Sequence, residues 1–201
     1  MCPGGFIVPS ATNQEEVVVN GMSPSRRDSE FANSGIVVAI EKEDIEKYQQ
    51  HGPFAGLELQ KEIERLAWIT GGKTQVAPAQ RMVDFVNHKR SDTLLKTSYQ
   101  PGLNSVKMDE VLPEGISFRL REAFKLFGKK MKGYLTNDAQ IVGVESRTSS
   151  PVFIPRDKES LEHIQVRKLF PCGEGAGYAG GIVSAAMDGE KCAETLIKKY
   201  G

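Results

Sequence analysis

The sequence predicts an α/β protein in which strand-rich ends flank a helix-rich middle. Short β-branched runs lie near the N-terminus and again between residues 139 and 156, and the segments between them carry apolar side chains at helical spacing. A glycine-rich turn followed by a helical pattern lies near the C-terminus. We therefore predict a discontinuous domain made of residues 1–35 and 149–201, with a mixed α+β domain inserted over residues 36–148.

Composition places the chain among ordinary globular proteins. It has 201 residues, of which 39% are hydrophobic and 26% charged, so it can bury a sizeable core. The formal net charge is zero, which predicts no nucleic-acid or membrane partner, and no apolar run is long enough to span a bilayer. The three cysteines are widely spaced and the three histidines show no ligand spacing, which favours a cytoplasmic protein without disulfides or a bound metal.

The N-terminal region is predicted to be rich in strands. It opens directly on a tight Cys-Pro-Gly-Gly turn, as though the chain begins partway through a fold. Two β-branched runs at residues 6–9 and 17–19 predict a hairpin or meander, and residues 20–34 are rich in turn formers, which predicts a loop. The apolar run over residues 35–40 predicts another strand.

Three helices are predicted in the middle of the chain. Apolar side chains at helical spacing predict the first over residues 57–69. Pro78 suits the first turn of the second helix, and Pro113 opens the third, which extends to about residue 131. Weak periodicity predicts mostly loop over residues 91–111.

The C-terminal region is predicted to return to strands before a last helix. Residues 139–156 indicate two strands joined by a polar corner, and residues 169–170 indicate a further short strand. A glycine-rich turn follows, and the last helix is predicted from Gly181 to about Lys199.

The glycine-rich turn has the spacing of a dinucleotide-binding motif. Residues 175–180 spell G-x-G-x-x-G between a predicted strand and a predicted helix. A Rossmann unit needs a second parallel strand after that helix, ending in an acidic residue, and this chain ends at Gly201 within the helix. Two interpretations remain: a helix N-terminus that holds a phosphate or an electron-rich ring edge, or a tight turn whose glycines serve geometry alone.

The same segment, "PCGEGAGYAGGIVSAAMDG", resembles the C-terminal flavin-binding segment of FAD-dependent oxidoreductases, and more narrowly a group of bacterial FAD-utilising dehydrogenases. The resemblance covers nearly the whole chain. The other matching segments are "CPGG", "NGMS" with "RRD", "GPFAGLELQKEIERLAW", "APAQRMVDF" and "GVESRTSSPV".

The resemblance implies a partial FAD-binding Rossmann-like domain with an inserted substrate domain. Glu174 matches the acidic residue that holds a ribityl hydroxyl of FAD. Gly180, Gly181 and Ile182 match the helix start that faces the pyrimidine end of the flavin ring, where N–H groups stabilise negative charge on the reduced ring. The cofactor-binding residues implied are Gly173, Glu174, Gly175, Gly177, Tyr178, Gly180, Gly181 and Ile182.

In the family, the first strand with its own G-x-G-x-x-G lies far upstream, and this sequence contains no such segment. We therefore expect the chain to be the C-terminal part of a longer dehydrogenase that acts on a small-molecule substrate. The chain alone is expected to bind FAD weakly or not at all and to be inactive. NAD(P) is left open as an electron partner, and the oligomeric state and the catalytic residues are not fixed by the sequence.

Candidate substrate-facing residues lie in three polar segments. Arg27 suits recognition of a carboxylate or phosphate, although a solvated loop explains it equally well. Arg147, Thr148 and Ser149 lie at a predicted strand end that resembles a family motif. Because polar residues at that corner have no packing reason, we expect them to line the cavity in front of the flavin, with an ordinary polar turn as the alternative. Cys2 offers a thiol near the flavin, although its Pro-Gly-Gly neighbours also fit a simple turn.

A second hypothesis treats the chain as a non-catalytic binding or interaction module with its helical middle as the docking surface. The glycine-rich turn separates the two hypotheses, because an interaction module does not need an acidic residue followed by close-approach glycines.

Overall fold

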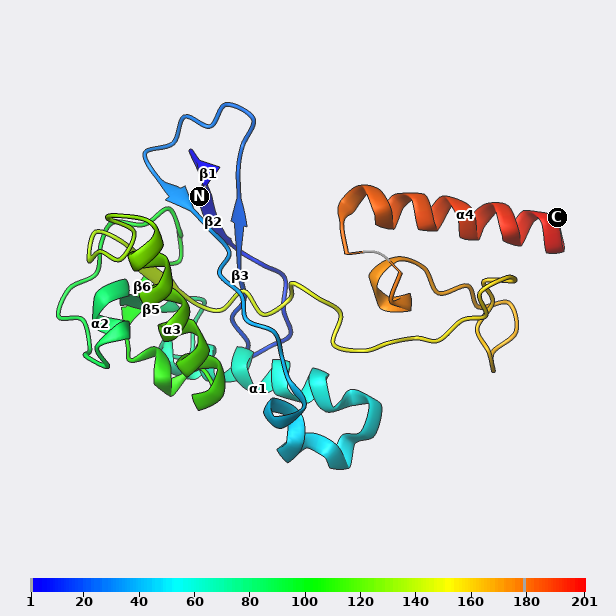
Figure 1. The fold of residues 1–201 in the computed structure, drawn as a ribbon, viewed down its shortest axis with the longest axis horizontal. Coiled ribbons are helices and arrows are strands. Elements are labelled where there is room, and N and C mark those ends of the chain that lie inside the picture. The colour runs from blue at the N-terminus through cyan, green and yellow to red at the C-terminus, as the bar shows by residue number, and fades with distance from the viewer. Residues whose placement is uncertain (1, 179) are drawn as a thin grey trace.

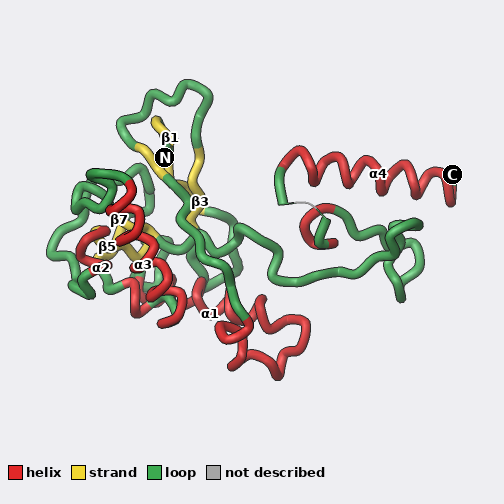
Figure 2. The backbone as a smooth tube through the Cα atoms, viewed as in Figure 1, coloured by secondary structure: helices red, strands yellow, loops and turns green. Residues whose placement is uncertain are grey.

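The computed structural model describes residues 2–178 and 180–201, in which helices and strands are joined by long loops (Figures 1 and 2). This mixed content is consistent with the predicted α/β class. Ala179, a variable position of the predicted glycine turn, lies outside the described residues. Within the described part of the chain, no helix is long and apolar enough to cross a membrane.

The N-terminal region forms two small antiparallel sheets. Strand β2 (Phe6–Pro9) pairs with β3 (Val19–Met22), and β1 (Cys2–Pro3) pairs with β4 (Ala32–Asn33). The predicted hairpin is therefore confirmed, but its second strand begins two residues later than predicted. Val17 lies just before β3, and its N–H donates instead to the carbonyl of Glu64 at 3.1 Å, which ties this region to a helix of the middle region.

The strand predicted over residues 35–40 is wrong. This segment is a loop that runs from β4 to the first helical element (Figure 2). Among the described residues, no neighbouring segment forms hydrogen bonds with its main chain, and a strand requires such a partner. The apolar side chains account for its placement instead, because Ile36 and Val38 pack on the core while Val37 and Ile40 are exposed.

The first and third predicted helices are confirmed. Element η1 (Lys42–Phe54) is a 3-10 helix that leads into α1 (Ala55–Thr70), and α3 (Glu114–Lys130) follows Pro113. Both α-helices turn an apolar stripe inward. The buried apolar residues of these stripes are Ala55, Leu59, Ile63 and Ala67 on α1, and Ile116 and Phe124 on α3.

The second predicted helix is confirmed over residues 82–86, but its predicted start is wrong, because Pro78 lies in a strand. Strand β5 (Ala77–Arg81) is the middle of a three-stranded sheet, parallel to β6 (Leu103–Ser105) and antiparallel to β7 (Gln140–Val142). Proline lacks an N–H donor, but the carbonyl of Pro78 still accepts the N–H of Gly143 at 3.0 Å. Helix α2 (Met82–Val86) forms only after the strand ends.

The segment predicted as mostly loop, residues 91–111, contains only β6 and the short 3-10 helix η2 (Met108–Glu110). It closes one side of the main core, which α1, α2, α3 and the three-stranded sheet share. Phe85 and Phe124 meet edge to face in this core, with ring centroids 6.1 Å apart. Val17 and Val19 from the N-terminal region pack into the same core. The division of the chain into two domains at residues 35 and 149 stays a prediction.

The C-terminal region contains less regular structure than predicted. Only β7 forms from the two strands predicted over residues 139–156, and no strand forms at residues 169–170; an isolated bridge between Arg156 and His163 is the sole pairing described there. None of the three sheets in the described part of the chain includes a strand from residues 143–201, and a strand requires such a partner. The last helix is confirmed as α4 (Ile182–Tyr200), which lies apart from α1, α2 and α3 (Figure 1).

Candidate functional site

The glycine turn is a short 3-10 helix, η3 (Gly173–Ala176), that leads into α4. Gly177 ends it in the left-handed conformation with φ of 76°, and its N–H donates to the carbonyl of Glu174 at 2.8 Å. A Cβ on Gly177 would lie 2.6 Å from the ring of Phe153. Glycine at this position is therefore required by the turn itself.

Two other glycines of the turn face open space. A Cβ added at Gly175 or Gly180 would meet no described atom within 4 Å. Gly181 caps α4, with its N–H donating to the hydroxyl of Ser184 at 3.2 Å, and Ile182 is 93% exposed. The start of α4 is consequently accessible to a ligand, and no large side chain of the described residues covers it.

Glu174 links the turn to the segment that follows residue 148. Residues up to 148 form the body of the protein, and the residues after it form the C-terminal region. Its side chain is exposed, and Oε1 accepts the N–H of Ser150 at 3.0 Å. The other carboxylate oxygen has no partner among the described residues. Glu174 therefore has an acceptor available for a hydroxyl group beside the glycine turn.

A buried ion pair fixes the turn against α4. The Arg156 guanidinium binds both carboxylate oxygens of Asp188, at 2.7 and 2.9 Å, and also donates to the carbonyl of Pro171. The N–H of Gly173 donates to the same carboxylate at 2.8 Å, and the Arg156 guanidinium lowers the pKa of Asp188. The ring of Tyr178 lies over Arg156 at 3.8 Å, so Tyr178 covers this pair. Sequence reasoning missed this pair, because Arg156 lies 32 residues from Asp188 and outside the segments that carry the family resemblance, although Asp188 belongs to the segment "PCGEGAGYAGGIVSAAMDG".

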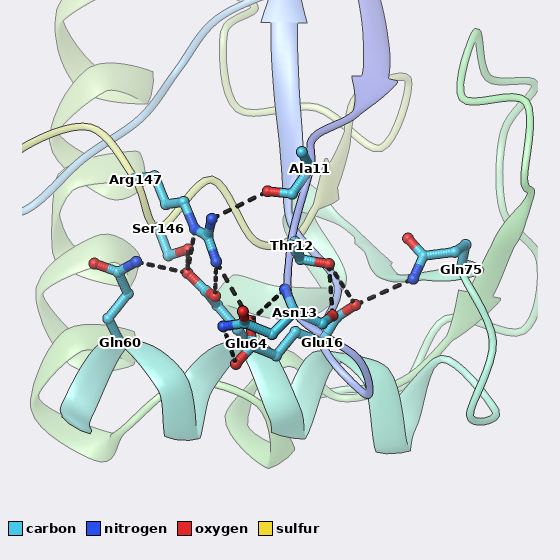
Figure 3. Close-up of polar contacts among 9 residues, drawn as sticks. All are labelled: Ala11, Thr12, Asn13, Glu16, Gln60, Glu64, Gln75, Ser146 and Arg147. Atoms are coloured by element: carbon cyan, nitrogen blue, oxygen red, sulfur yellow. Dashed lines mark hydrogen bonds and ion pairs between the residues drawn. The ribbon is translucent and has the colours of Figure 1, made fainter. Parts of the chain in front are cut away.

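Arg147 lies elsewhere, in a polar cluster that joins three segments (Figure 3). Its guanidinium forms a bidentate pair with Glu64 on α1, at 3.0 and 2.7 Å, and also contacts Glu16 and the carbonyl of Ala11. Ser146 donates to Glu64 at 2.6 Å. The guanidinium of Arg147 thus binds the protein's own carboxylates, and none of its described hydrogen bonds reaches the glycine turn.

Glu64 is the buried centre of this cluster, with 0% of its surface exposed. Burial by itself raises the pKa of Glu64, but the hydrogen bonds from Arg147, Ser146 and Gln60 outweigh burial, and its pKa is lowered. Glu64 is therefore held as a carboxylate at neutral pH. The cluster stabilises the junction between the N-terminal strands, α1 and the segment after β7.

Thr148 and Ser149 do not belong to the polar cluster of Arg147. Both line a cavity of about 850 Å³ between α1, α3, β7 and residues 36–40. Ser150, whose N–H donates to Glu174, lines it as well. Thr148 and Ser149 therefore line a cavity, and Ser150 at the edge of that cavity is hydrogen-bonded to Glu174 of the glycine turn.

Arg27 and Cys2 are not brought to the turn. Arg27 is exposed in the loop between β3 and β4, which lies on a different side of the molecule from α4 (Figure 1). The Cβ of a residue replacing Gly4 would lie 2.1 Å from the Arg27 main chain, so this glycine fits the backbone of Arg27 closely. Cys2 belongs to β1, and its side chain lies outside what the structure describes. No group of three or more potential metal ligands occurs among the described residues.

The comparison with known families concerns the mixed α/β part of the chain that precedes the glycine turn. Residues 1–148 match the family described as FAD-dependent protein, C-terminal domain-like, and the chain belongs to this family. The resemblance to the C-terminal portion of FAD-dependent proteins is thereby confirmed.

The chain is also 43% identical over 202 residues to an uncharacterised protein of Clostridium beijerinckii. That alignment covers 100% of this chain and 37% of the relative, so the chain spans little more than a third of the relative's length. The family match ends at residue 148, whereas the alignment with the relative includes the glycine turn.

Proposed function

We propose that this chain is the C-terminal part of an FAD-dependent dehydrogenase in which the glycine turn and the start of α4 contact the flavin. Residues 1–35 and 149–201 would belong to a Rossmann-like FAD-binding domain, and residues 36–148 to a domain that faces a small-molecule substrate. The observation that carries the proposal is the open start of α4, where Ile182 is 93% exposed and a Cβ on Gly180 would meet no described atom within 4 Å.

The residues present at this helix start suit a flavin. The first N–H groups of a helix carry partial positive charge, and those of Ile182 and Val183 have no partner among the described hydrogen bonds. Such donors favour negative charge on a reduced flavin, and the free oxygen of Glu174 suits a ribityl hydroxyl. When bound, FAD would supply the transfer of a hydride or an electron pair.

The chain by itself should hold FAD weakly. The resemblance assigns the pyrophosphate-binding turn and the adenosine contacts to an upstream segment, which this sequence does not contain. Those contacts contribute much of the affinity for a dinucleotide, because they use a helix N-terminus and several main-chain donors. The proposal therefore concerns the dehydrogenase as a whole, with this chain supplying one side of its flavin site.

An NMR titration of the chain with FAD tests the site. We expect weak binding, with amide shifts confined to residues 173–178 and 180–183. Gly180→Leu should abolish these shifts, because the new side chain fills the approach to the helix start. Gly189→Leu is the matched control, since it adds the same side chain to open space further along α4 and should leave the shifts unchanged.

Two results would count against the proposal. The first is an absence of shifts at the glycine turn when FAD is added up to its solubility limit. The second is equal binding by the Gly180→Leu protein. A stoichiometric yellow complex would instead contradict the expected weak affinity.

An interaction module is the second candidate, and one observation favours it. Helix α4 exposes Ile182, Val183, Met187 and Ile197, and exposed apolar side chains on one helix are typical of a protein–protein contact. The same titration separates the two functions, because a pure interaction module gives no FAD-dependent shifts at the turn.

A further inference from the structure

The cavity beside Thr148 and Ser149 is apolar along most of its wall. Helix α1 contributes Leu59 and Ile63, α3 contributes Ile116 and Leu120, and β7 contributes Ile141. Its volume of about 850 Å³ falls within the range of about 300–1,000 Å³ that is usual for small-molecule sites. The cavity is therefore large enough for a substrate-sized molecule and offers it mainly aliphatic contacts.

Most polar groups of the cavity come from the stretch of chain that follows β7. This stretch contributes Glu145, Ser146, Thr148 and Ser149, and Gln60 of α1 adds an amide to the same wall. Ser146 is already bonded to Glu64, whereas the hydroxyl groups of Thr148 and Ser149 have no partner among the described side chains. The cavity thus combines an apolar body with a polar end that carries hydroxyl groups and the carboxylate of Glu145, and that end adjoins Ser150 and its bond to Glu174.

The walls favour a small molecule over a polypeptide segment. A polypeptide brings an N–H and a carbonyl at nearly every residue, and each needs a hydrogen-bond partner when buried. Along α1 and α3 the main-chain groups are bonded within the helices, so these two walls offer no such partners, whereas residues 36–40 have main-chain groups without a described backbone hydrogen bond. An aliphatic molecule with one polar end needs no partner along these walls.

We infer that this cavity binds the apolar body of a hydrophobic substrate that carries a hydroxyl or carbonyl group at one end. The inference rests on the proposed function for its reaction but not for its binding site. The polar end of the substrate would lie against Thr148 and Ser149, on the side of the cavity that is bonded to the glycine turn. The substrate class is accordingly a long-chain or isoprenoid alcohol or its carbonyl form, rather than a sugar or an amino acid.

A titration with lauryl alcohol, followed by methyl NMR without FAD, tests the inference. We expect shifts of the cavity methyl groups, such as those of Leu59, Ile116 and Ile141, with no shift of Ile182 and Val183 on the exposed face of α4. Glucose serves as the polar control and should shift none of them. Because no flavin is present, failure here leaves the flavin proposal standing, and failure of the FAD titration leaves this result standing.

Two variants on α3 locate the binding. Leu120→Trp narrows the cavity and should weaken lauryl alcohol binding by about tenfold. Leu126→Trp adds the same ring on the same helix at a side chain that is 47% exposed and outside the cavity, and it should bind as the parent chain does. If Leu120→Trp fails to fold by circular dichroism, Val37→Trp at the exposed rim replaces it. Unchanged affinity in the narrowed variant, or methyl shifts confined to α4, would overturn the inference.

Discussion

The residues before and after position 148 differ in what holds them together. In the body, Leu59 and Phe124 are each 3% exposed and belong to one continuous apolar core. In the C-terminal region, Ile182 is 93% and Ile197 64% exposed, and α4 packs mainly against its own glycine turn. The first region is stabilised by burial of apolar surface, whereas the second buries little of its apolar surface within the described structure.

The two regions use buried ion pairs differently as well. Glu64 and Arg147 join segments that are 83 residues apart, and so lock the body together. Arg156 and Asp188 join only parts of the C-terminal region to one another, and so fix the glycine turn on α4. The C-terminal region therefore keeps its local shape while its outer face stays available for a ligand or partner.

The largest contrast should come from matched truncations of apolar side chains in the two regions. Phe124→Ala removes a buried ring and should lower the free energy of unfolding by about 3–5 kcal/mol. Ile182→Ala removes an exposed side chain and should change it by less than about 0.5 kcal/mol. Urea unfolding followed by circular dichroism measures both, and similar losses in the two variants would show that the contrast between the regions is wrong.

An intermediate effect is expected from the ion pair of the body. Glu64→Ala leaves Arg147, Ser146 and Gln60 without their shared acceptor. We expect a loss of about 2–3 kcal/mol, below the value for a fully buried pair, because the Arg147 side chain is 37% exposed and water can reach it. Glu58→Ala breaks an exposed pair on the same helix and should have little effect on the same unfolding curve. A loss no greater than that of the Glu58→Ala control would show that this cluster contributes little to the stability of the protein.

The smallest effect is a pH response confined to the C-terminal region. The N–H of Lys168 and the ammonium of Lys199 on α4 lower the pKa of Glu162 from 4.5 to about 2. Because the folded pKa lies below the unfolded one, the stabilisation is complete above about pH 4.5 and is lost as the pH falls toward about 2. NMR shifts of Lys199 and Tyr200, the residues of α4 that donate to Glu162, should follow this change, and Glu162→Gln should remove it there while leaving shifts of the body unaffected. A pH response that persists in the variant would assign it to another group.

Local sequence patterns predicted the helices well and the strands poorly. The apolar stripes of α1, α3 and α4 are complete within each segment, so their periodicity was sufficient. Residues 35–40 have strand-forming side chains but no partner, and Pro78 was placed in a helix although the sheet accepts it. Whether a segment becomes a strand depends on what lies beside it, and that is decided by residues far away in the sequence.

The candidate site likewise contains features that the local sequence predicted and features that it did not. The sequence by itself determined the glycine turn, the acidic residue beside it and the helix that follows, because these features lie within a few residues of one another. Only the tertiary structure decided that Arg147 serves Glu64, that Thr148 and Ser149 line a cavity, and that Arg156 secures the turn. Each of these depends on a partner more than 30 residues away or on walls from several elements, and long-range packing of that kind leaves no local pattern in the sequence.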